Sequence, residues 1–84
     1  MTPLPIPDVL TVYGADWCDD CRATRRYLDD AGVPYRYIDL RTDREAQQDL
    51  DAAGHRAIPV VLVPDGTILV EPSAAELARA LQAA

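Results

Sequence analysis

Short apolar runs and helical repeats of apolar residues alternate along this chain. Four runs rich in β-branched and aromatic residues have the length and composition of strands: 9–13, 35–39, 60–63 and 67–70. Gly14 ends the first run, which we expect to form a buried central strand. The last two runs flank Pro64, Asp65 and Gly66, residues typical of a tight turn. These two strands should therefore pair as an antiparallel hairpin.

Three other segments place apolar residues at the spacing of one helix face. The first runs from Asp19 to Ala31 and is followed by Gly32, a residue that commonly ends helices. The second helix is expected to close at Gly54. The second and third helices open with a hydroxyl residue and a glutamate in capping-box spacing, Thr42 with Glu45 and Ser73 with Glu76.

The order of elements is therefore β-α-β-α-β-β-α, an α/β arrangement. The helix between the first two strands favours a parallel, right-handed crossover, so we expect a four-stranded mixed sheet flanked by three helices. With 84 residues, of which 49% are hydrophobic, the chain suffices for one core. Proline at positions 3, 5 and 7 favours an extended, solvated backbone. We interpret residues 1–7 as a flexible proline-rich tail and residues 8–84 as a single domain.

The charge of the chain narrows the class of partner. The formal net charge is −6, whereas binding to a phosphate backbone needs a basic surface, so nucleic acid is not an expected partner. No apolar run reaches the roughly 18–20 residues that span a bilayer, and the first residues lack the pattern of a signal peptide. We expect a cytoplasmic protein with no membrane partner.

The residues that carry chemistry are the two cysteines, Cys18 and Cys21, which follow the first strand and open the first helix. First-turn amides and the helix dipole stabilise a thiolate at the first sulfur, and the two-residue spacing keeps the second sulfur within reach. This pattern predicts a redox pair in which Cys18 attacks and Cys21 resolves. Two alternatives stay open: half of a zinc site, for which His55 is the only imidazole, or two small buried residues.

A proline before the third strand adds context to this pair. Ile58 and Pro59 directly precede the run 60–63. A cis bond here would present the backbone of Ile58 beside the sulfurs, where it can hydrogen-bond a partner's extended backbone. The alternative interpretation is an ordinary proline that opens a strand.

Three segments, GADWCDDC, AIPVV and EPSAAEL, in this order and spacing resemble the glutaredoxin family, and most of all its mycoredoxin-type branch, which has tryptophan before the first cysteine. The resemblance covers the chain from Val9 to the C-terminus. It implies a thioredoxin-like fold, Cys18 as nucleophile, Cys21 as resolving cysteine and Pro59 as a cis-proline. It also implies three positions around a bound low-molecular-weight thiol: Arg56, Ile58 and Ser73. Together with Trp17 and Pro59, these are the residues that we expect to bind the substrate.

Two departures from the family's pattern bear on which thiol is used. Ala15 stands where many glutathione-using members carry a lysine, and residues 71–74 replace the usual glycine-rich loop and its following aspartate. The resemblance therefore does not single out glutathione. Mycothiol, another small thiol or a protein disulfide fits as well. The small thiol is expected as a co-substrate, with no bound cofactor and no metal.

The residues beside the first cysteine invite further hypotheses. Asp19 and Asp20 each oppose a thiolate at Cys18 by about 1 kcal/mol at an effective dielectric constant near 40, an amount similar to the favourable helix-dipole effect. We expect the Cys18–Cys21 disulfide to be more reducing than it would be with uncharged residues at these two positions. The alternative is that the two acids only cap the helix.

The two other residues near the first cysteine have several possible roles. Arg22 screens these acids, receives a partner's carboxylate or is merely solvated. Trp17 is expected as an exposed apolar platform, with core packing as the alternative.

We therefore expect an enzyme, a monomeric thiol-disulfide oxidoreductase that reduces protein disulfides or mixed disulfides between proteins and small thiols. We expect its electrons to come from a low-molecular-weight thiol. In the alternative hypothesis, the protein is a thioredoxin-like reductant that a flavoprotein reductase reduces. A competing class is a glutaredoxin that holds an iron-sulfur cluster through Cys18 of two subunits. The last alternative is an interaction module whose sulfurs are incidental.

Overall fold

The computed structural model describes residues 2–83, so Met1 of the predicted tail and Ala84 of the predicted domain lie outside the described residues. The elements follow the predicted order, β-α-β-α-β-β-α. Their bounds are β1 Thr11–Gly14, α1 Asp19–Asp30, β2 Arg36–Asp39, α2 Arg44–Ala52, β3 Val60–Leu62, β4 Ile68–Val70 and α3 Ala74–Ala83. Each predicted strand is present. β1 starts two residues later than its apolar run and includes Gly14, and each of the other three strands is one residue shorter than its run.

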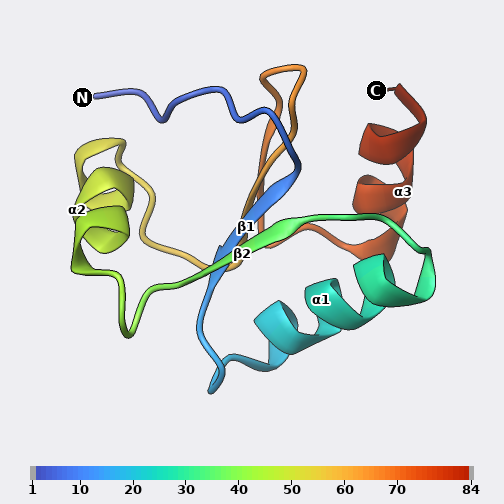
Figure 1. The fold of residues 1–84 in the computed structure, drawn as a ribbon, viewed down its shortest axis with the longest axis horizontal. Coiled ribbons are helices and arrows are strands. Elements are labelled where there is room, and N and C mark those ends of the chain that lie inside the picture. The colour runs from blue at the N-terminus through green and yellow to red at the C-terminus, as the bar shows by residue number, and fades with distance from the viewer. Residues whose placement is uncertain (1, 84) are drawn as a thin grey trace.

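The four strands form one mixed sheet in the order β2-β1-β3-β4, with helices on both sides (Figure 1). β1 pairs with β2 in parallel and with β3 antiparallel, so Val12 lies between Tyr37 and Val61. β3 and β4 form the predicted antiparallel hairpin, in which Val61 pairs with Leu69. The thioredoxin-like fold expected from the sequence is confirmed.

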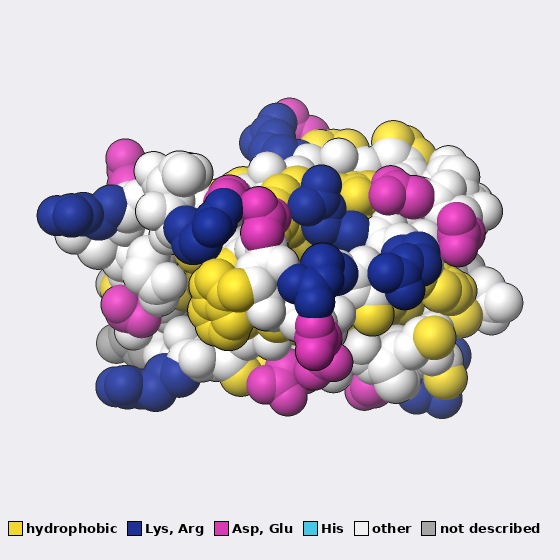
Figure 2. All heavy atoms as spheres, turned by 90° about the horizontal axis from the view of Figure 1, so that it is seen from below, with side chains coloured by type: hydrophobic (Ala, Val, Ile, Leu, Met, Phe, Trp, Pro, Cys, Tyr) yellow, Lys and Arg dark blue, Asp and Glu magenta, His cyan; other side chains and the backbone are white. Residues whose placement is uncertain are grey.

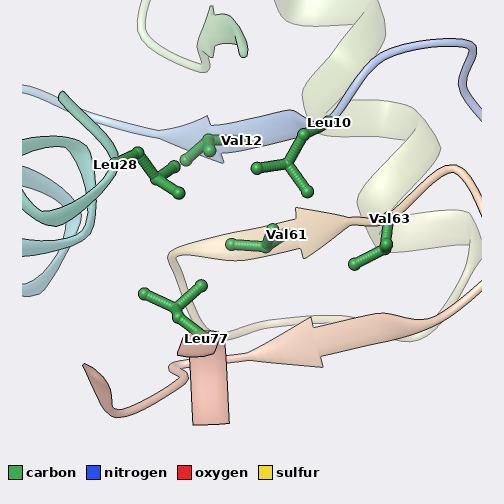
Figure 3. Packing of buried hydrophobic residues seen from close by; sticks show 6 residues of the cluster. All are labelled: Leu10, Val12, Leu28, Val61, Val63 and Leu77. Carbon is green, nitrogen blue, oxygen red and sulfur yellow. The ribbon is translucent and has the colours of Figure 1, made fainter. Parts of the chain in front are cut away.

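Alternation along the two central strands supplies one core on each face of the sheet, because successive side chains point to opposite faces. On one face, side chains of β1, β3 and their flanks meet one leucine from α1 and one from α3: Leu10, Val12, Val61, Val63, Leu28 and Leu77 (Figure 3). Leu28 is fully buried, which stabilises the docking of α1 by about 1.5–3 kcal/mol. This contact fixes the helix that carries both cysteines.

The opposite face packs against α2. Tyr13, Val60 and Leu62 from the sheet meet Ala46 and Leu50 of the helix. α2 covers this side of the sheet in Figure 1, whereas α1 and α3 lie on the other side, and this second core is smaller than the first.

The proline-rich segment at the N-terminus has no regular secondary structure over residues 2–7 and lies beside α2. The amide of Thr2 donates to the carbonyl of Ala52 at 2.9 Å, and Leu4 packs against the second core. Ile6, by contrast, is largely exposed. The flexibility of this segment remains a prediction, and its contacts give a means of testing it.

The helix ends confirm two sequence predictions and correct one. Gly32 has a φ of +70°, and the amide of Val33 donates to the carbonyl of Leu28 at 3.0 Å, as expected for a glycine that ends a helix. The Ser73 hydroxyl accepts from the Glu76 amide at 3.1 Å, and the Glu76 carboxylate accepts from the Ser73 amide at 2.9 Å. The predicted capping box of α3 is therefore present.

The capping box predicted from Thr42 and Glu45 is wrong. Asp43 caps α2 instead, because its carboxylate lies one residue closer and accepts from the Ala46 amide at 2.9 Å. The Thr42 hydroxyl is used elsewhere, as a donor to the carbonyl of Asp39 at 3.3 Å. Both side chains favour caps, and the chain's exit from β2 decides between them.

Across the part of the chain that the structure describes, no helix has the length and apolar character needed to cross a membrane.

Candidate functional site

The loop between β1 and α1 carries the first cysteine. β1 ends at Gly14, and the chain turns so that the amide of Cys18 donates to the carbonyl of Ala15 at 3.1 Å. Cys18 has an extended backbone and is the N-cap residue of α1, one turn before Cys21. Cys18 is half-buried, whereas Cys21 is completely buried, and both are free thiols. Only the first sulfur is open to a partner.

The sulfur of Cys18 takes the place of the oxygen that usually caps a helix. It accepts a hydrogen bond from the backbone amide of Cys21, with 3.2 Å between nitrogen and sulfur. A negative charge on this sulfur is therefore stabilised by a first-turn amide and by the helix dipole. On its other side the sulfur lies 3.9 Å from the carbonyl oxygen of Ile58, toward which the neutral thiol points its proton.

The second sulfur has the opposite character. The pKa of the Cys21 thiol is raised to about 12. Burial is the largest cause, and the hydrogen bond with the Cys18 side chain is the second. A hydrogen bond with the backbone of Ala15 lowers it, whereas the charge of Asp20 adds to the increase. Cys21 thus keeps its proton at neutral pH while Cys18 is accessible. The order of attack, with Cys18 first, remains a prediction.

The charges around Cys18 are partly paired. Asp19, whose side chain is 89% exposed, forms an ion pair with Arg22 in the next turn, and Arg22 also donates to the backbone carbonyl of Asp16. Arg22 thus screens one of the two acids, one of the roles predicted for it. Asp20 has no such cation among the ion pairs of the described residues.

Sequence reasoning missed a second set of charged residues beside the site. Asp16 lies 3.0 Å from Arg41 and 3.8 Å from Arg25, so it links the end of β2 to α1. The guanidinium of Arg25 also stacks over the ring of Tyr37, 3.8 Å from its centroid. Figure 2 shows arginine and acidic side chains interleaved with apolar ones on the face below this loop. Local patterns carry no signal for these contacts, because the partners come from different elements.

A groove of about 300 Å³ lies on one side of the loop. It brings together Trp17, Arg56 and Ile58, three of the residues expected to surround a bound thiol. Trp17 is 68% exposed, so it is not packed in the core, and its role as an apolar platform remains a prediction. The groove also contains residues that the sequence analysis did not propose as binding residues: Leu40, Arg41, Gln47, Leu50 and His55.

Pro59 and Ser73, the other two expected binding residues, lie elsewhere. The bond between Ile58 and Pro59 is cis, as the resemblance implied, and Pro59 itself is buried. Ser73 lines a separate groove of about 330 Å³, together with Asp20 and Thr24 of α1. The expected binding residues are therefore divided: three line the first groove, Ser73 lines the second, and the buried Pro59 lines neither.

Within residues 2–83, no group of three or more histidine, cysteine or carboxylate side chains is arranged to hold a metal ion.

Several known proteins are similar to this chain in sequence or in fold. The glutaredoxin family model matches residues 10–68. Mycoredoxin 1 of Corynebacterium glutamicum is 37% identical over 76 residues, which cover 88% of this chain and 94% of that protein. The solved structure of the glutaredoxin-like protein NrdH-redoxin from Escherichia coli is 28% identical, with a TM-score of 0.77, and the match covers 83% of this chain and 91% of that one.

A solved thioredoxin-like protein has a TM-score of 0.80 over 90% of this chain and 97% of its own, at 19% identity, and this similarity concerns the fold alone. The family model covers well over half of the described residues and includes the Cys18–Cys21 pair. The relatives are matched over nearly their full lengths, so the comparison concerns whole domains. The chain belongs to the glutaredoxin family.

Proposed function

We propose that the protein is a thiol-disulfide oxidoreductase that reduces protein disulfides, or mixed disulfides between proteins and small thiols, through Cys18 and Cys21. One observation carries the proposal. An accessible sulfur caps a helix and accepts from the amide of Cys21, while the second sulfur lies one turn away, buried and protonated. Such a pair separates an attacking thiol from a resolving thiol by environment alone.

The reaction proceeds in two exchanges. The Cys18 thiolate attacks one sulfur of the substrate disulfide, a bond forms between Cys18 and that sulfur, and the other substrate sulfur leaves as a thiolate that takes up a proton. Cys21 then loses its proton to solvent and attacks Cys18, so the intramolecular disulfide forms and the remaining substrate thiol leaves. Two electrons pass from the protein to the substrate. A small thiol or a reductase must then reduce the Cys18–Cys21 disulfide.

We propose that the groove beside Trp17 binds the part of the substrate that is attached to the sulfur attacked by Cys18. Trp17 offers an exposed apolar face, and Arg56 offers a cation to a carboxylate. The backbone beside Pro59 positions the carbonyl of Ile58 near Cys18.

The structural support for substrate binding by Ser73 is weaker than that for Trp17 and Arg56. Its hydroxyl already accepts from the amide of Glu76, and it lines the second groove. We propose it for the far end of a bound thiol only.

The similarity to mycoredoxin 1 favours a low-molecular-weight thiol, such as mycothiol, as the electron donor. The similarity to NrdH-redoxin, whose activity profile is described as thioredoxin-like, favours a flavoprotein reductase as the second candidate. Parallel assays that supply either reduced mycothiol, reduced glutathione or NADPH with a flavoprotein reductase separate the two. Turnover with mycothiol alone supports the first candidate, and turnover with the reductase alone supports the second.

Trapping tests the proposed chemistry directly. The Cys21→Ser variant should stall at the mixed disulfide, so mass spectrometry of the intact protein should show one added thiol on Cys18. The Cys18→Ser variant, which keeps the buried thiol, is the matched control and should gain no adduct. An adduct of equal yield on both variants would contradict the assigned roles.

Three expectations about the setting of the protein belong to the same proposal. We propose that it acts in the cytoplasm, where small thiols are reduced, and as a monomer. A shared iron-sulfur cluster is not favoured by any contact at the site. Visible absorbance after anaerobic purification would nevertheless reveal one.

A further inference from the structure

Gly14, the last residue of β1, lies directly against the resolving cysteine. It is buried and pairs with Asp39 of β2, and its carbonyl accepts from the amide of Leu40 at 2.9 Å. A Cβ atom at this position would lie 2.9 Å from the Cys21 sulfur and 3.1 Å from the Cys21 Cβ. It would also lie 3.3 Å from Cε1 of Tyr37.

These distances leave no room for a side chain. Favourable contacts between carbon atoms occur at about 3.5–4.0 Å, so even a methyl group would overlap the Cys21 sulfur. The backbone does not demand glycine here. The glycines with positive φ are Gly32, Gly54 and Gly66, whereas Gly14 is part of a regular strand. Space for the sulfur therefore explains why the residue at this position is glycine.

The surroundings make the sulfur the part that would have to move. Gly14 pairs with β2, the preceding Tyr13 pairs with β3, and the ring of Tyr37 lies under the guanidinium of Arg25. Cys21 is itself fully buried at the start of α1, and its amide bonds to the Cys18 sulfur. The Cys21 side chain is thus packed directly against the backbone of Gly14.

We propose that Gly14 is a positioning residue that holds the Cys21 sulfur where it can attack the mixed disulfide at Cys18. The inference rests on the proposed function. The step concerned is the second exchange, in which Cys21 gives its proton to solvent and bonds to Cys18, and the substrate thiol leaves. A misplacement of about 1 Å can slow such an intramolecular step by about 100-fold, so a shift of about 0.5 Å should slow it by about tenfold. The first attack needs the Cys18 sulfur and the backbone amide of Cys21, neither of which is among the three atoms nearest to the added methyl group, so it should be spared.

A stopped-flow reaction with one equivalent of dithiobis(nitrobenzoate), an aromatic disulfide that releases a coloured thiolate when it is reduced, separates the two exchanges. The natural chain should release one nitrobenzoate thiolate when Cys18 attacks and a second when Cys21 resolves. The Cys21→Ala variant should show the first phase only, which assigns the phases. In Gly14→Ala, the second phase should slow by about tenfold, while the rate of the first stays within about twofold.

The outcomes distinguish the two proposals. A natural chain that releases no thiolate, or only one, contradicts the proposed function. If both phases appear and Gly14→Ala leaves the second unchanged, or slows both equally, Gly14 does not position Cys21.

Urea unfolding keeps the inference testable if Gly14→Ala folds poorly. The Gly14→Ala substitution should lower the free energy of unfolding less in the Cys21→Ala variant than in the natural chain, because the Cys21→Ala variant lacks the sulfur that clashes most closely. An equal cost in both backgrounds overturns the inference.

Discussion

Raising the pH should destabilise the protein through the buried thiol of Cys21. Burial, followed by the hydrogen bond with Cys18, raises the pKa of Cys21 from an ordinary 9.0 to about 12. In the unfolded chain the same thiol is exposed to water and ionises near its ordinary pKa. Between these two values the unfolded state has lost a proton that the folded state keeps. The free energy of unfolding therefore falls as the pH rises through this window.

Linkage gives the size of the loss. Each pH unit within the window costs about 1.4 kcal/mol of unfolding free energy for one proton. The contribution is intact at about pH 7, and about 1.4 kcal/mol is lost near pH 10. In a domain of this size, each kcal/mol corresponds to about 4–8 °C in Tm. Burial also raises the pKa values of Tyr13 and Tyr37, which extend the loss to more alkaline pH.

Urea unfolding in the presence of a reductant, followed by circular dichroism across this pH range, measures the effect. The Cys21→Ala variant is the control. It should be less stable at neutral pH because it lacks a buried sulfur, but its stability should fall less steeply because the titrating thiol is gone. Both proteins retain Cys18 and every tyrosine. Parallel pH dependences in the two proteins would refute the reasoning that the folded state protects the Cys21 proton.

Three further predictions concern stability. Tyr37→Phe should raise the free energy of unfolding by about 1 kcal/mol, because the buried Tyr37 hydroxyl finds no hydrogen-bond partner among the described residues; a loss in thermal unfolding would contradict this. Asp43→Ala should cost about 1 kcal/mol and Thr42→Ala clearly less, since only Asp43 caps α2; equal costs in urea would restore the sequence-based assignment. Leu4→Ala should cost about 1 kcal/mol if the N-terminal segment stays packed on the second core, whereas unchanged unfolding would show that residues 2–7 form a mobile tail.

Local patterns were sufficient for most of the fold. Period-two alternation and helical spacing each depend on a few neighbouring residues, and they predicted every strand and helix in order. The turn after β3 and the capping box at Ser73 were also predicted, because both are made within four residues. The cap of α2 was the exception: Thr42 and Asp43 are adjacent and both suited to the position, and the path of the chain after β2 chose between them.

The sequence by itself indicated the candidate chemistry, because a Cys-x-x-Cys pair at the start of a helix brings two sulfurs within reach of each other through local geometry. Only the tertiary structure decided what surrounds them. It brought Arg41 and Gln47 into the groove beside Trp17, and it placed Gly14 against the buried second sulfur. These neighbours are set by strand register and helix docking. Such contacts join residues far apart in the chain, and no local pattern records them.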